Sequence, residues 1–233
     1  MIKKDNPIIL NENKNNLGIN YYKNLYNKIQ NEIINRFNDF EKIKQKASED
    51  ELFTELCFCL CTPQTKAINA DKAIKKLIEN NAILTGNNDE IAKYLKGLVR
   101  FHDNKAKYII EARNKFRDKN TNKIYIKKYI FDANKNNKDI REFFYENVKG
   151  LGLKEASHFV RNIGLGENIA ILDRHILKNL KLLKVIQEIP KTLTKKTYFD
   201  IEKKLENFSK KINIKMHHLD FVFWYNETEK IFK

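Results

Sequence analysis

Apolar residues recur at helical spacing along most of the chain. The first such run, which predicts an amphipathic helix from Leu17 onward, contains Tyr21, Leu25, Ile29, Ile33 and Phe37. The same periodicity predicts further helices across residues 48–61, 67–78, 91–98, 105–116, 140–148, 153–163, 173–183, 194–208 and 216–225. Together these segments predict an all-α protein.

Two segments lack a clear pattern. Residues 1–16 carry little periodicity, and we expect a flexible or loosely docked N-terminal arm there. Residues 117–137 are rich in Asn and Lys. Within them Ile124-Tyr125-Ile126 is compatible with a short strand, and a polar connection with one helical turn fits equally well.

The second predicted helix has the most apolar body. Ser48, with Glu51 three residues later, is a capping box at its start. The next positions include Leu52, Phe53, Leu56 and Leu60. Pro63 cannot continue a helix comfortably, so the helix should end just before it. We therefore expect a buried central helix.

The three cysteines, Cys57, Cys59 and Cys61, all lie on this helix. Their spacing is not that of a zinc or iron–sulfur site, and no second cluster completes one. On a helix Cys57 and Cys61 share a face, which favours buried thiols over metal ligands. We expect no metal site and no iron–sulfur cluster.

A helix-breaking tripeptide, Gly150-Leu151-Gly152, separates two segments of helical periodicity. Two helices joined in this way form a helix-hairpin-helix. Its glycines let the backbone approach a partner closely, and the first amides of the second helix have no partner within that helix. Such donors, at the positive end of a helix dipole, suit a phosphate oxygen. Lys154 lies in the first turn of the second helix, so it is the leading candidate for a functional side chain.

Composition adds a preference for anionic partners. The chain has 233 residues, of which 42% are hydrophobic, so it can bury a real core. Its formal net charge of +15 suits a protein that binds a polyanion. A Lys-, Asn- and Ile-rich chain is also what an AT-rich genome produces, so charge alone leaves nucleic-acid binding open. No apolar run reaches membrane-spanning length and residues 1–6 lack the apolar core of a signal peptide, so we expect a soluble intracellular protein.

The hairpin and the residues after it resemble a known enzyme family. Gly150-Leu151-Gly152-Leu153-Lys154 is succeeded, after a glycine-containing loop, by Asp173 in Ile171-Leu172-Asp173-Arg174-His175. This order is similar to that of the helix-hairpin-helix DNA glycosylases, which include endonuclease III and the 8-oxoguanine glycosylases. The ending Leu219-Asp220-Phe221-Val222-Phe223-Trp224-Tyr225, with a terminal Lys233, looks like the type-2 8-oxoguanine DNA glycosylase/AP lyases. The lack of a four-cysteine C-terminal cluster separates the chain from endonuclease III itself.

The resemblance implies a two-lobed fold. One lobe would be a helical bundle over residues 48–164 that ends in the hairpin. The other would join residues 17–47 to residues 165–233 and carry the catalytic Asp and the base pocket. The implied protein is a monomer without cofactor, located in the cytoplasm and associated with the nucleoid. Its implied partner is double-stranded DNA that contains 8-oxoguanine or abasic sites.

The implied reaction is base excision and then strand cleavage. The damaged base is flipped out of the duplex. The amine of Lys154 displaces it, forms a Schiff base with the sugar, and β-elimination then cuts the strand. The positive helix end disfavours the charged form of this amine, while Asp173 at its own helix start stays ionised and stabilises positive charge on the sugar. Taken singly, Lys154 could be a solvated surface lysine and Asp173 a plain N-cap.

Base recognition is implied for three further residues. Trp224 would offer a ring to the flipped base, and Asp220 would hydrogen-bond it. Lys233, with the terminal carboxylate, would distinguish 8-oxoguanine from guanine, since only the oxidised base carries a hydrogen on N7. The alternatives are a core aromatic for Trp224, a residue satisfying a buried neighbour for Asp220 and a frayed end for Lys233.

Contacts to the rest of the duplex are implied by three other positions. Gln64, in Cys61-Thr62-Pro63-Gln64, and Phe101, in the segment 99–106, look like residues that fill the gap left by a flipped base. His175 would contact a phosphate. Each also has a plain interpretation, as an ordinary turn residue for Gln64 and Phe101 and as a helix-capping neighbour for His175.

Two other functions stay open. A glycosylase for oxidised pyrimidines would share the same fold and lysine chemistry. A helix-hairpin-helix module that binds DNA without catalysis would need only the hairpin.

Overall fold

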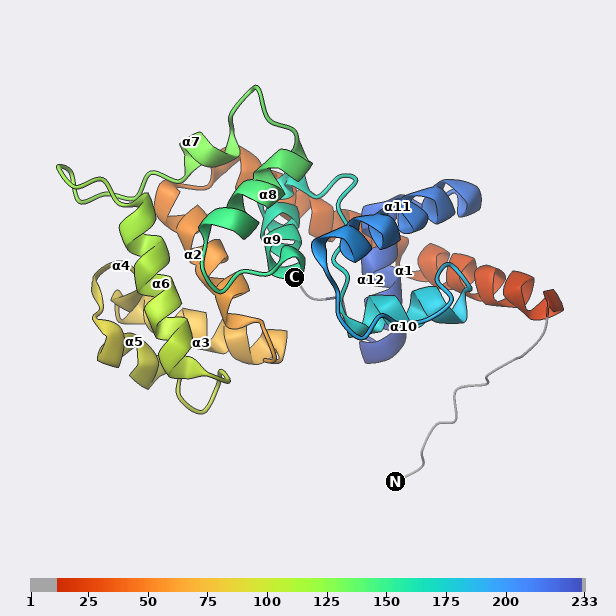
Figure 1. The fold of residues 1–233 in the computed structure, drawn as a ribbon, viewed down its shortest axis with the longest axis horizontal. Helices are drawn as coiled ribbons and strands as arrows, with labels where there is room; N and C mark the ends of the chain where they lie inside the picture. The colour runs from red at the N-terminus through yellow and green to blue at the C-terminus, as the bar shows by residue number, and fades with distance from the viewer. Residues whose placement is uncertain (1–11, 232–233) are drawn as a thin grey trace. The chain divides into compact units, whose positions relative to one another are not determined.

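The computed structural model describes residues 12–231 of the chain, and within them it is built from helices (Figure 1). The helices are α1 Glu12–Lys46, α2 Glu49–Cys61, α3 Ala67–Glu79, α4 Ala82–Thr85, α5 Asn88–Leu95, α6 His102–Phe116, α7 Lys127–Ile130, α8 Asn137–Asn147, α9 Leu153–Val160, the π-helical turn η1 Arg161–Leu165, α10 Arg174–Leu182, α11 Lys195–Ile212 and α12 Met216–Thr228. The predicted all-α class is confirmed. No helix in this described part is long and apolar enough to cross a bilayer.

The chain divides into two compact units. Of the described residues, the smaller unit contains 12–33 and 172–230, and the larger contains 34–171 and Ile231. The sequence-based expectation puts the boundaries at residues 47 and 164 instead. The difference arises because α1 continues without a break to Lys46, and its last part belongs to the larger unit.

The packing of Phe40 explains the first of these shifts. Its side chain is only 2% exposed, and the guanidinium carbon of Arg161 lies 5.5 Å from the centre of its ring. The backbone of Gly164 comes so close that a Cβ atom there would lie 2.7 Å from the carbonyl oxygen of Phe40. Ile169 likewise joins the core of the larger unit. Residues 34–46 and 165–171 therefore pack with the helical bundle.

The expected central helix is α2. The Ser48 hydroxyl accepts a hydrogen bond from the Glu51 N–H at 3.2 Å, and the Glu51 carboxylate accepts one from the Ser48 N–H at 2.7 Å, which confirms the capping box. The helix lies among α3, α6 and α9 in the core of the larger unit (Figure 1). Its three cysteines are buried, as expected. Burial raises the pKa of the Cys61 thiol to about 12 and that of the Cys57 thiol well above its usual value.

In the segment 117–137 the structure supports the polar connection with one helical turn, and of the alternative strand it has only a single bridge. Arg117 and Ile124 form an isolated antiparallel bridge, and α7 adds one short helix after it. The Glu49 carboxylate accepts hydrogen bonds from the N–H groups of Ile126 and Lys127 at 2.6 and 2.9 Å. This segment is thereby fixed to the start of α2.

The beginning of the chain differs in part from expectation. Helix α1 starts at Glu12, inside the segment 1–16 that the sequence predicts to be an arm. Residues 12–16 are polar, so they carry no apolar repeat, yet a helix that has already formed over the following residues can extend through them, since propagation costs far less than nucleation. Residues 1–11 lie outside the described part.

The smaller unit packs the first part of α1 with α10, α11 and α12. The rings of Tyr22 and Phe223 meet edge to face, with centroids 5.2 Å apart. The Tyr22 hydroxyl donates a hydrogen bond to the side-chain oxygen of Asn179, which is buried on α10. Burial raises the pKa of Tyr22. These contacts hold α10 and α12 against the long first helix.

Candidate active site

The hairpin occupies residues 148–152, between α8 and α9 of the larger unit (Figure 1). Gly150 has φ +87°, a left-handed conformation that side chains rarely adopt. It also rests on the ring of Tyr108, since a Cβ at this position would lie 2.3 Å from Cδ2 of that ring. The first hairpin glycine is therefore required both by its backbone conformation and by the closeness of α6.

The second glycine starts the second hairpin helix. Gly152 is the N-cap residue of α9, with φ −81° and ψ 172°, and it supplies no side-chain cap. The first N–H groups of a helix have no partner within the helix, and they lie at its positive end. This arrangement suits an anion such as a phosphate oxygen, as the sequence predicts.

Lys154 lies on the first turn of α9 beside a carboxylate that the sequence does not single out. Its side chain is 25% exposed, and its Nζ lies 3.2 Å from Oε1 of Glu155, whose side chain is 13% exposed. The side chain is thus partly exposed, and its amine is paired with an acidic group. An acidic residue in the first turn of a helix is common, so nothing in the sequence marks Glu155 as a functional neighbour.

Gln64 and Phe101 lie on two turns that the larger unit brings together. Both residues have a left-handed backbone, with φ values of 54° and 56°. Gln64 is exposed, and Phe101 is 54% exposed, a large fraction for a phenylalanine. The N–H of Arg100 donates a hydrogen bond to the Thr65 hydroxyl at 3.2 Å and so links the two turns directly.

Asp173 lies in the smaller unit, where it caps α10. Its Oδ1 accepts hydrogen bonds from the N–H groups of His175 and Ile176 at 2.8 and 2.9 Å. The predicted capping role is confirmed. These bonds fix the orientation of the carboxylate at the positive end of the helix.

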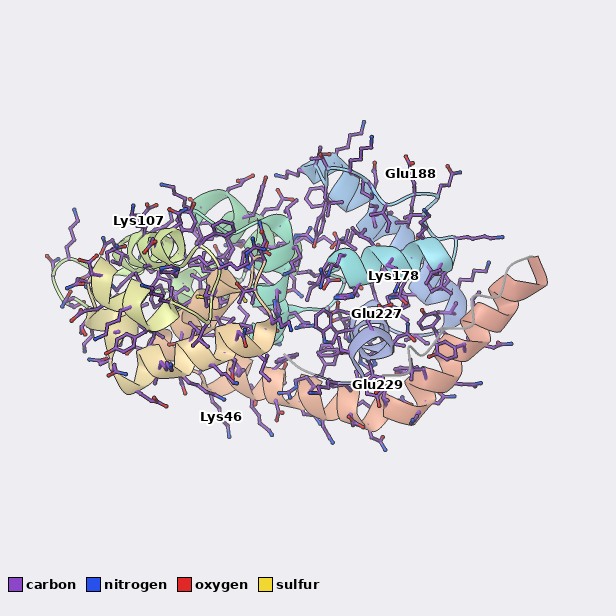
Figure 2. The ribbon with its side chains drawn as sticks, turned by 90° about the horizontal axis from the view of Figure 1, so that it is seen from below. Lys46, Lys107, Lys178, Glu188, Glu227 and Glu229 are labelled. Atoms are coloured by element: carbon purple, nitrogen blue, oxygen red, sulfur yellow. The ribbon has the colours of Figure 1, made fainter. Side chains whose placement is uncertain are left out.

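An aromatic and charged cluster surrounds His175. The ring of Trp224 on α12 meets its imidazole edge to face, with centroids 4.9 Å apart. Glu227, on the same helix, has its Oε2 3.8 Å from Nδ1 of His175 and 2.9 Å from Nζ of Lys178, and Figure 2 shows the Glu227 and Lys178 side chains close together. Trp224 is half-buried, so it is not the fully enclosed core aromatic of the alternative interpretation. Asp220 is also half-buried, one turn earlier on α12.

The predicted site residues therefore fall into two groups. The larger unit carries Gly150, Gly152, Lys154, Gln64 and Phe101. The smaller unit carries Asp173, His175, Trp224 and Asp220. Lys233 lies outside the described residues. Between residues 12 and 231, no group of three or more His, Cys, Asp or Glu side chains is arranged to hold a metal ion.

Comparison with known proteins gives a consistent result. Residues 33–214 match a family model described as 8-oxoguanine DNA glycosylase. The chain is 40% identical over 220 residues to the 8-oxoguanine DNA glycosylase/AP lyase of Fusobacterium nucleatum, covering 94% of this chain and 100% of the relative. The Methanocaldococcus jannaschii 8-oxoguanine glycosylase/lyase, solved in complex with a 15mer DNA containing 8-oxoguanine, superposes with a TM-score of 0.81 at 37% identity, covering 92% of this chain and 99% of that one. The 8-oxoguanine DNA glycosylase of Thermotoga maritima superposes with a TM-score of 0.82 at 29% identity, covering 94% of this chain and 100% of that one. This chain belongs to the 8-oxoguanine DNA glycosylase family.

Proposed function

We propose that this protein excises 8-oxoguanine from duplex DNA and then cleaves the strand at the resulting abasic site. The observation that carries the proposal is the partly exposed Lys154 on the first turn of α9, two residues after the second hairpin glycine. Relatives that match over most of the chain are named for both the glycosylase and the lyase activity.

The covalent step begins at the amine of Lys154. Its lone pair attacks C1′ of the flipped nucleotide, the bond from C1′ to the base breaks, and the base leaves with that electron pair and takes up a proton. Opening of the sugar ring then gives an imine between C1′ and Nζ. Loss of a proton from C2′ expels the 3′ phosphate oxygen, which cuts the strand.

Two carboxylates have distinct parts in this scheme. Asp173, held by its capping hydrogen bonds, stabilises the positive charge that develops on the sugar as the base departs. Glu155, 3.2 Å from the Lys154 amine, is within reach to accept the proton that the amine must lose before it attacks. The amine must also leave this ion pair to reach the sugar.

The remaining site residues bind the DNA. The first amides of α9 hold a phosphate, and Gln64 and Phe101 occupy the space that the flipped base leaves. His175 contacts a phosphate of the flipped nucleotide, while Trp224, Asp220 and Lys233 contact the base. The protein acts in the nucleoid-associated cytoplasm, since that is where its DNA substrate lies. It acts there as a monomer.

Excision from duplexes that each carry one lesion tests this function. The protein should release free 8-oxoguanine, detected by mass spectrometry, and should cleave the lesion strand on the 3′ side. A preference for thymine glycol would favour a pyrimidine glycosylase. Tight binding without release of any base would favour a non-catalytic hairpin module.

A further inference from the structure

Lys105 is an almost fully buried lysine near the start of α6. Its residue is 4% exposed, and its three N–H groups have three acceptors. Nζ donates hydrogen bonds to the carbonyl oxygens of Cys61 and Pro63 at 2.8 and 2.6 Å, and to the Thr65 hydroxyl at 3.2 Å. All three acceptors lie in the segment 61–65, at the end of α2 and just beyond it. Lys105 therefore neutralises the negative end of α2 from a different helix.

Thr65 extends this link to the turn before α6. Its hydroxyl oxygen accepts hydrogen bonds from the Lys105 amine and from the N–H of Arg100, both at 3.2 Å. The turn that contains Gln64 is therefore held to the turn that contains Phe101. Lys105 and Thr65 form the connection.

Both linked turns hold an exposed side chain on a left-handed backbone. The φ values of Gln64 and Phe101 are 54° and 56°. This left-handed backbone conformation costs energy for residues other than glycine. Strained conformations of this kind persist where the surrounding structure holds them in place. The hydrogen bonds of Lys105 and Thr65 provide that constraint.

A buried cation is a costly way to connect two turns. The pKa of Lys105 is lowered to about 8, chiefly by burial. Cys61 and Glu155 act in the opposite direction and raise it, while the cations Lys154 and Arg100 lower it further. An apolar side chain would fill the same space without this desolvation cost. The presence of a lysine at this position is explained if its three directed hydrogen bonds fix a geometry that an apolar residue would leave loose.

We propose that Lys105 is a positioning residue that holds the Gln64 and Phe101 turns in one arrangement, so that both side chains enter the DNA duplex together when the damaged nucleotide leaves it. The inference rests on the proposed function, because only an enzyme that flips a base leaves a gap to be filled. It assigns to Lys105 no contact with the base or the sugar.

The test compares duplex and single-stranded substrates. Lys105→Met keeps the length of the side chain and removes its donors, and Thr65→Val keeps the shape and removes the shared acceptor. Each should slow 8-oxoguanine excision from a duplex by roughly tenfold or more, as expected when a hydrogen bond to a charged donor is lost. Cleavage of an abasic site in a single strand needs no gap-filling and should stay within about twofold of wild type. Lys107→Met, on the exposed side of α6, is the matched control (Figure 2).

A double-mutant cycle separates positioning from general structural support. In a background that carries Gln64→Ala and Phe101→Ala, Lys105→Met should have little further effect on duplex excision, because the side chains that it positions are gone. Three results would overturn the proposal: unchanged duplex excision, equal loss on both substrates, or an undiminished effect of Lys105→Met in that background. If Lys105→Met does not fold, the same three measurements on Thr65→Val test the proposal. A wild-type protein that releases no 8-oxoguanine would instead contradict the proposed function.

Discussion

Gly150 meets two separate physical requirements at one position. Its φ of +87° lies where a side chain is strained, and the Tyr108 ring fills the space that a Cβ would need. Gly97 shares only the first requirement, with φ +79° and nothing within 4 Å of a Cβ built there. Comparing substitutions at these two glycines of the same unit therefore distinguishes the effect of backbone strain from that of steric exclusion.

Gly150→Ala and Gly97→Ala should differ in stability and in DNA binding. The Gly97 variant should lose about 1–2 kcal/mol of unfolding free energy from backbone strain alone. The Gly150 variant should lose about 2–4 kcal/mol, because the ring of Tyr108 must also move. Urea unfolding measures the first quantity, and duplex binding should weaken only in the Gly150 variant. Equal losses in both variants would mean that the Tyr108 contact is unimportant.

The sequence predicts some of these residue-level features and not others. The G-x-G spacing predicts a close backbone approach, and the lysine two residues later stands out because it falls in the first turn of the next helix. Tyr108, Glu155 and Lys105 escape notice, because their importance comes from contacts that spacing along one helix does not reveal. Lys105 in particular is a charged residue in a charged stretch, and nothing local indicates that it is buried.

At the scale of helices, α12 shows the limit of periodicity. Its buried residues lie on several sides, so its sequence predicts burial without predicting which face meets which neighbour. Two histidines lie near its start. Burial lowers the pKa of both His217 and His218 to about 4, and the Tyr26 hydroxyl lies 2.9 Å from Nδ1 of His218.

These histidines should make the fold sensitive to acid. Between pH values of about 6.5 and 4 the unfolded chain binds protons at these two histidines that the folded chain does not. The stability that comes from keeping them neutral is therefore complete above about pH 6.5 and is lost as the pH falls through this window. The free energy of unfolding should fall between pH 7 and pH 5 by on the order of 1 kcal/mol more in wild type than in a variant with both histidines changed to Gln. Parallel pH profiles for the two proteins would contradict this assignment.

Helix α2 leads to a prediction about thiol chemistry. The three cysteines are buried, and burial raises the pKa of the Cys57 and Cys61 thiols, while the thiolate is the reactive form. The native protein should therefore react with Ellman's reagent at least about a hundredfold more slowly than the urea-unfolded protein. Rapid labelling of any cysteine without unfolding would show that α2 is not the closed centre of the larger unit.

At the scale of the whole molecule, the periodic pattern predicts the helical class and the order of the helices, but not where the two units divide. Helix α1 crosses the boundary as one continuous helix, and its residues before and after Ile33 belong to different units. An amphipathic repeat shows that a helix has a buried face, yet it does not show which body that face packs against. The division could therefore not be read from hydrophobic spacing.

The net charge of +15 is a property of the entire chain, and it predicts strongly salt-dependent DNA binding. The logarithm of the association constant should fall linearly with the logarithm of salt concentration, with a slope of about −4 or steeper if roughly four or more phosphates are neutralised. Titration of a fluorescent duplex at several salt concentrations measures this slope. A slope near zero would mean that the lysines reflect composition alone.

The central claim is that the Lys154 amine becomes bonded to the sugar of the damaged nucleotide. Borohydride reduces an imine to a stable amine, so it should trap wild-type protein on a duplex that contains 8-oxoguanine. The matched control Lys107→Gln should be trapped equally well, and Lys154→Gln should give no covalent complex. Trapping of Lys154→Gln at the wild-type level, or no trapping of wild-type protein on a substrate that it cleaves, would contradict the account.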